Sequence, residues 1–219
     1  MAQPVDLPDR AAATTSRIID RLQRGYLAGA PEAATVLAQL RRTDGTVARL
    51  PAALWPAVDL TALGLPTEDG TRPNDDAVRA AEDATVLATV LWALHQHSST
   101  TPMHRTAPAD ADGPPSWLGL GGALRRLAAT GTGPTEYSLL ARLTAARTSL
   151  PIPAPHLTYL VRMLATAGIP LDYAHLSWQL TRWPMPGGRT DTSAQWARSW
   201  WRTTPRRADR ADASPARTA

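Results

Sequence analysis

Three histidines lie close together in the sequence, and imidazoles that converge could bind a metal ion. His95 and His97 flank Gln96 near the end of a predicted helix, and His104 follows in a loop. Two residues apart on a helix, side chains point in different directions, whereas zinc-binding histidine pairs on helices are spaced i, i+4. We therefore predict a packed or helix-capping pair, with no metal site and no cofactor. A metal-dependent nuclease that uses these histidines is the competing hypothesis.

Residues for nucleophilic catalysis do not form any familiar pattern. The chain has no cysteine and no lysine, and it contains no Gly-x-Ser-x-Gly motif. The glycine-rich stretch 119–122 (GLGG) has neither a preceding strand nor the Lys-Ser/Thr pair of a phosphate-binding loop, so it predicts close helix packing or a helix entry. The sequence thus favours a protein that is not an enzyme and has no catalytic residues.

Arginine supplies every one of the 23 basic side chains, and its planar guanidinium suits phosphate. Residues 113–207 hold 11 Arg against 3 Asp+Glu, whereas residues 1–112 hold 10 Arg against 14 Asp+Glu. This asymmetry predicts a polyanion partner for the second half, with contacts to the nucleic-acid backbone. Base stacking is not expected, because the tryptophans at 178, 183, 196 and 200 fit apolar helix faces. We expect the arginines of its helices to lack acidic partners; they are Arg125, Arg126, Arg142, Arg147, Arg162 and Arg182.

Helical periodicity and the spacing of the 20 prolines predict short helices, and no segment alternates like a strand. We expect an all-α fold of two small helical-bundle domains, 1–98 and 116–203, with a linker at 99–115 and a disordered tail at 204–219. Neither a signal peptide nor an apolar run of membrane-spanning length is present, so no membrane contact and a cytoplasmic location are expected. The predicted helices are 14–28, 31–42, 75–98, 117–129, 134–147, 154–167, 173–183 and 193–202.

Several helix patterns follow one another in a recognisable order. They are LRR (40–42), WALHQHS (92–98), LGGALRRLA (120–128), LLARLTAAR (139–147), HLTYLVRML (156–164), IPLDYAHLSWQLTRW (169–183) and QWARSWW (195–201). Together they resemble the CasB family, the small subunit of the type I-E CRISPR surveillance complex, Cascade. The chain departs from the family at 136–139 (EYSL), where a pair of arginines is usual, so we expect its DNA contacts to shift toward Arg142 and Arg147.

This resemblance implies a non-catalytic role within an RNA-guided complex. Two copies would lie against the backbone and large subunits and hold the target and displaced DNA strands of the R-loop, while RNA–DNA pairing reads the sequence. By position, the family's basic residues correspond first to Arg42, Arg147 and Arg162, and then to Arg41, Arg125, Arg126 and Arg182. The alternative is a helical scaffolding protein whose arginines contact acidic protein partners and not DNA.

Overall fold

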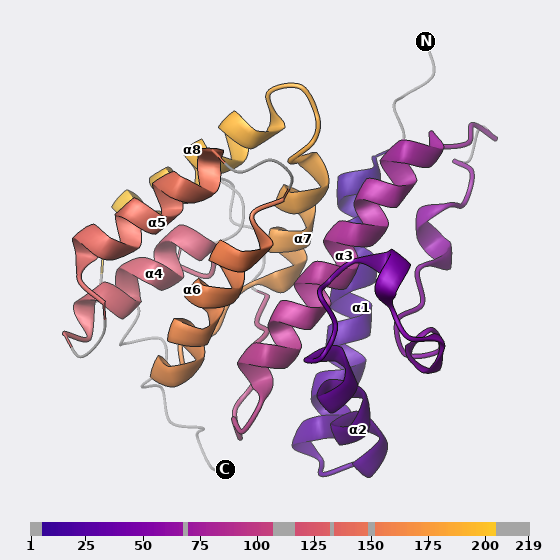
Figure 1. Ribbon diagram of the computed structural model, residues 1–219, viewed down its shortest axis with the longest axis horizontal. Coiled ribbons are helices and arrows are strands. Elements are labelled where there is room, and N and C mark those ends of the chain that lie inside the picture. The colour runs from indigo at the N-terminus through magenta and orange to yellow at the C-terminus, as the bar shows by residue number, and fades with distance from the viewer. Residues whose placement is uncertain (1–5, 68–69, 107–116, 132–133, 149–151, 205–219) are drawn as a thin grey trace, which may run out of the picture.

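The computed structural model describes residues 6–67, 70–106, 117–131, 134–148 and 152–204, and of residues 146–148 it describes only the backbone. These segments form helices without strands, as Figure 1 shows, so the predicted all-α class is confirmed for the described part of the chain. The α-helices are α1 (Leu7–Leu27), α2 (Pro31–Leu40), α3 (Asp75–Gln96), α4 (Leu120–Ala129), α5 (Glu136–Thr148), α6 (Ala154–Ala167), α7 (Tyr173–Arg182) and α8 (Gly188–Arg202). Three 3₁₀ turns, Val47–Arg49, Ala52–Leu54 and Thr61–Leu63, connect α2 to α3.

Two helices begin earlier than their sequence pattern predicts. Helix α1 starts at Leu7, not at residue 14, because the Asp6 carboxylate accepts a hydrogen bond from the Asp9 N–H, 3.3 Å away, and Pro8 occupies the first turn. Leu7 and Ala11 of this added segment are buried. Helix α8 starts at Gly188, not at residue 193. The first turns of both helices contain few large apolar side chains, so helical periodicity in the sequence does not reveal where these helices begin.

Capping residues set two other helix ends at the positions that the sequence predicts. The Asp172 carboxylate accepts from the His175 N–H at 2.9 Å and begins α7. At the end of α6, Gly168 adopts φ 63° and ψ 29°, the left-handed conformation that glycine takes most readily. The predicted end of α6 at residue 167 and the predicted start of α7 at residue 173 are therefore confirmed.

Helix α7 lies at the centre of the packing. It belongs to the second half of the sequence but packs against α1 and α3 of the first half, while α6 packs on α3 and α8 packs on α4 and α5 (Figure 1). Buried apolar side chains from both halves form one continuous cluster. The division into two domains at 99–115 stays a prediction, and the described helices on either side of it share this core.

The first part of the predicted linker is packed against the core. Met103 and His104 are buried, and the Leu171 N–H donates to the Met103 carbonyl at 3.0 Å. An isolated parallel bridge joins His104 to Leu171. Residues 99–106 are therefore an anchored loop that ties α3 to the start of α7; residues 107–115 of the predicted linker, and 205–219 of the predicted disordered tail, lie outside the described residues.

A buried polar cluster joins the two halves of the sequence. The Tyr173 hydroxyl lies 2.7 Å from Nδ1 of His95, and the Tyr173 N–H donates to Nδ1 of His104 at 3.2 Å. Gln23 accepts from the His104 N–H at 2.9 Å and from Nε1 of Trp92 at 3.2 Å. Because buried polar groups need partners, these bonds fix the register of α7 against α1 and α3.

Candidate nucleic-acid interface

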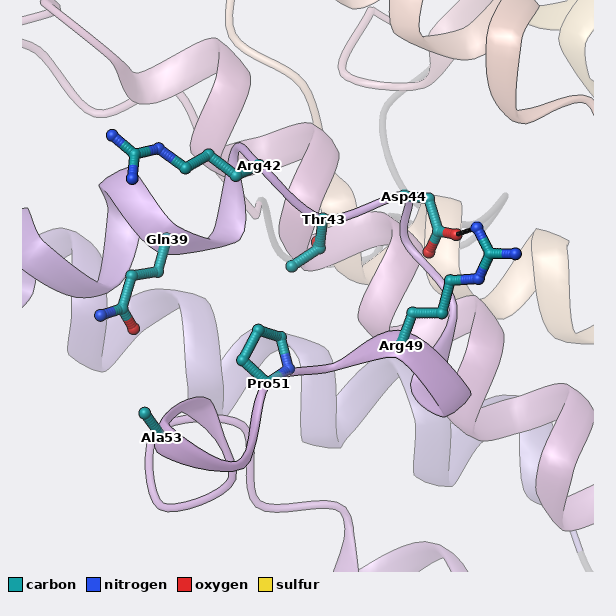
Figure 2. A pocket seen from close by; sticks show the side chains of 7 residues that line it. All are labelled: Gln39, Arg42, Thr43, Asp44, Arg49, Pro51 and Ala53. Atoms are coloured by element: carbon teal, nitrogen blue, oxygen red, sulfur yellow. Dashed lines mark hydrogen bonds and ion pairs between the residues drawn. The ribbon is translucent and has the colours of Figure 1, made fainter.

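Arg42 lines a surface hollow of about 450 Å³, which is formed by the end of α2 and the residues that come directly after it in the sequence. Asp44 turns toward Arg49, with Nη1 of Arg49 3.0 Å from the carboxylate, while Arg42 extends to the other side (Figure 2). Arg42 is exposed, and no carboxylate of the described residues pairs with it. The hollow therefore carries one guanidinium available to an anion; its lining is Gln39, Arg42, Thr43, Asp44, Arg49, Pro51 and Ala53.

Arg41, the neighbour of Arg42, is half-buried at the end of α2. Its Nε atom is buried without a hydrogen-bond partner. Its charge also contributes to lowering the pKa of His97, although burial is the larger cause. Arg41 thus faces the end of α3 more than solvent.

The two arginines of α4 make contacts within the chain. Nη1 of Arg125 lies 2.5 Å from a carboxylate oxygen of Glu136 on α5, and its guanidinium lies 5.5 Å from the ring centre of Trp200. Arg126 is half-buried, with its guanidinium 5.7 Å from the ring centre of Trp117. The expectation that Arg125 lacks an acidic partner is wrong, because Glu136 approaches it from another helix.

Helix α5 presents Arg142 to solvent. Its guanidinium lies 3.7 Å from the ring centre of Tyr159 on α6, which orients an exposed charge over an aromatic face. Arg147 lies in the last turn of α5, but its side chain is outside the described residues. The role predicted for Arg147 therefore stays a prediction.

Arg162 is exposed on α6, in the middle of the helix. Its neighbours Leu160, Val161 and Leu164 are buried, so the helix face that carries Arg162 points away from the core. Within the described segments no carboxylate pairs with its guanidinium. Among the described arginines predicted in the second half, Arg142 and Arg162 are both exposed, and Arg162 has neither a carboxylate nor an aromatic partner.

Arg182 on α7 has an acidic partner as well. Its Nη2 atom lies 3.4 Å from the Asp191 carboxylate on α8, and its guanidinium lies 4.7 Å from the ring centre of Trp178. The side chain is half-buried. For Arg182, as for Arg125, the expected lack of an acidic partner is wrong.

Helix α8 adds charges that the sequence analysis did not single out. Arg198 and Arg202 are exposed on it, and no carboxylate in the described ranges pairs with either. Their signal was present in the sequence, because positions 198 and 202 lie off the buried Trp196 and Trp200 face. Unpaired, exposed arginines therefore lie on α6 and α8 and directly after α2, and phosphate groups are their natural ligands.

Two of the three histidines considered as metal ligands, His95 and His104, are buried in the core. Burial lowers the pKa of His95 to about 4 and also lowers the pKa of His104. His97, in contrast, is exposed at the end of α3. His95 is packed and His97 is the C-cap residue of α3, as predicted for this pair. Among the described residues no group of three metal-ligating side chains comes together.

Comparison with known proteins decides the family. A family model described as CRISPR-associated protein Cse2 matches residues 36–201, which is most of the chain. The chain belongs to the Cse2 family. Membership in this family, whose members are also named CasB, confirms the predicted resemblance and assigns the chain to the type I-E Cascade complex.

A solved Cse2-family structure shares this fold. The crystal structure of CasB from Thermobifida fusca superimposes with a TM-score of 0.70 at 25% sequence identity, over 87% of this chain and 97% of that chain. A search of curated protein sequences finds no match. In the described part of this Cse2 chain, no helix is both long and apolar enough to cross a bilayer.

Proposed function

We propose that this Cse2-family subunit is non-catalytic and stabilises the R-loop by binding the phosphates of its DNA strands. The observation that carries the proposal is the set of exposed arginines without acidic partners, above all Arg42 and Arg162. An exposed guanidinium group binds an anion most strongly when no carboxylate of the same chain already neutralises its charge. The described surface thus offers several independent phosphate contacts.

Such contacts carry no sequence information. Phosphates are alike at every step of a DNA strand, so these arginines would fix position while the guide RNA reads the bases. The complex's backbone and large subunits, and a second copy of the chain, are the proposed neighbours. The mildly acidic first half suits contacts with protein more than with DNA.

The test is the lifetime of an R-loop held by the assembled complex. Arg42→Gln and Arg162→Gln each remove a charge, and we expect each to shorten the lifetime by about 2- to 5-fold, the effect of one lost solvent-exposed ion pair with a phosphate. Arg49→Gln is the matched control, because Asp44 already neutralises that exposed arginine. Its lifetime should equal that of the wild-type complex.

Unchanged lifetimes in a complex that contains both Arg42→Gln and Arg162→Gln would contradict the proposal. If the same variants instead failed to enter the complex, the arginines would be contacting acidic protein partners. That second result would support the scaffolding alternative. Retained helical circular dichroism in each variant excludes misfolding as the cause.

A further inference from the structure

Helix α8 exposes one of its tryptophans to water. Trp196 and Trp200 are buried, whereas Trp201 is 68% exposed. Successive residues of an α-helix are about 100° apart, so Trp201 leaves the buried face that Trp200 completes. Trp201 is not one of the tryptophans that the sequence pattern places on apolar helix faces.

Five of the six tryptophans in the second half of the sequence contact an aromatic or guanidinium group, but Trp201 has no such contact among the described residues. None of the aromatic or guanidinium contacts among the described residues involves its indole. An exposed indole without such contacts has its aromatic surface available to a ligand. The paired tryptophans of the second half are Trp117 with Arg126, Trp178 with His175 and Arg182, Trp183 with Trp196, and Trp200 with Arg125.

Two cations accompany this indole. Arg198 precedes Trp201 by one helical turn, Arg202 follows it directly, and both are exposed. The acidic residue of α8, Asp191, already pairs with Arg182 on α7. The exposed end of α8 therefore combines an open aromatic face with two charges that no described carboxylate neutralises.

We infer that Trp201, Arg198 and Arg202 form a binding site for an unpaired nucleic-acid strand. A base stacks on the indole, and the two guanidinium groups, which are i, i+4 neighbours on the helix beside it, contact phosphates of the same strand. In a duplex the bases already stack on each other, so the site selects single strands. The inference rests on the proposed DNA-binding function and adds the class of strand that this face takes.

The chemistry of the surrounding surface favours nucleic acid over a protein partner. A protein-docking surface surrounds an exposed ring with further large apolar side chains. Beside Trp201 on the exposed face of α8 are Ala197, Arg198 and Arg202. A base and its neighbouring phosphates match one exposed ring beside two cations.

The experiment uses the full-length chain and three labelled probes at low salt. They are oligo(dT) of about 20 nucleotides, longer than one site of this kind, an abasic strand of the same length, and a duplex of the same length. We expect Trp201→Ala to weaken binding of oligo(dT) by about 5- to 150-fold and to leave the other two probes unchanged. Trp201→Phe should restore much of the loss, because a phenyl ring still stacks.

Trp55→Ala is the matched control, since Trp55 is another exposed tryptophan, 46% accessible, in the acidic half. It should bind all three probes like the wild type. Arg198→Gln with Arg202→Gln should weaken the abasic strand as well as oligo(dT), and should lower the salt slope by about 0.7 per lost contact.

Two negative results separate this inference from the function on which it rests. If the wild-type chain binds oligo(dT) and Trp201→Ala binds it equally well, the stacking site is wrong and the proposed DNA binding stands. If the wild-type chain binds none of the three probes at low salt, the stacking site is contradicted, while the R-loop lifetimes of the assembled complex decide the proposed function. Loss of complex assembly in Trp201→Ala, with unchanged oligo(dT) binding, would assign the indole to a protein contact.

Discussion

Individual arginines in this protein differ in how much charge they offer to a ligand. Arg125 and Arg182 each have a carboxylate partner and an aromatic ring, so part of their charge is neutralised within the chain. Among the described residues, Arg42 and Arg162 pair with neither a carboxylate nor an aromatic ring. Phosphate binding should therefore depend on the second pair far more than on the first.

His95 makes the stability of the fold depend on pH. Burial lowers its pKa to about 4 from the ordinary 6.5, so the folded chain keeps it neutral while the unfolded chain binds a proton below about pH 6.5. The contribution of neutral His95 to the free energy of unfolding is therefore fully present above about pH 6.5 and is lost as the pH falls toward 4. We expect the free energy of unfolding to drop by about 2 kcal/mol between about pH 7 and pH 5 from His95.

Urea denaturation at these two pH values checks this prediction. His95→Gln should show a clearly smaller drop than the wild type, because its side chain does not titrate. His97→Gln is the control, since His97 is exposed two residues away and should keep nearly the wild-type pH dependence. Equal drops in the wild type and His95→Gln would show that His95 does not cause the effect.

At the scale of the helices, close packing of α4 on α8 depends on Gly121. A Cβ atom at this position would lie 2.8 Å from the carbonyl carbon of Trp196 and closer still to its oxygen and to Oγ of Ser199. The contact confirms the prediction of close helix packing at GLGG. The same contact holds the helix that carries Arg198 and Arg202.

Gly121→Ala should therefore destabilise the fold by about 1–3 kcal/mol, the usual cost of forcing an extra carbon into a packed interface. Gly64→Ala is the control, because its Cβ would meet no atom within 4 Å and its φ is −89°. Thermal unfolding followed by circular dichroism measures both variants. A melting temperature of Gly121→Ala equal to that of Gly64→Ala would contradict the packing described.

Sequence periodicity predicted the helices well where apolar side chains recur, and less well at ends set by other means. The bounds of α6 agree with 154–167, because buried leucines repeat along it and Gly168 ends it. The starts of α1 and α8 were placed late, because an aspartate cap and a glycine-rich turn set them.

The candidate site was predictable only in part. Periodicity placed Arg162 on an outer face, but the partners of Arg125 and Arg182 come from neighbouring helices. Glu136 and Asp191 reach them through tertiary packing, which spacing along the chain does not contain. Trp201 was overlooked because it follows directly after a buried tryptophan.

For the whole molecule, the continuous core has a consequence for binding. Arg42 belongs to the first half and Arg162 to the second, yet α3 and α6 pack on each other and the two halves share one apolar cluster. Arginines from both halves of the sequence are therefore held by elements that share one core. A strand that contacts both arginines would meet them without first ordering the protein, which lowers the entropic cost of binding.

The salt dependence of the affinity of the assembled complex for R-loop DNA tests the central claim most directly. Each phosphate contact contributes about 0.7 to 0.9 to the slope of log affinity against log salt concentration. We predict that a complex with both Arg42→Gln and Arg162→Gln has a slope smaller by about 1.4 to 1.8 than the wild-type complex. An unchanged slope, in a complex that still contains the subunit, would contradict phosphate binding by these arginines.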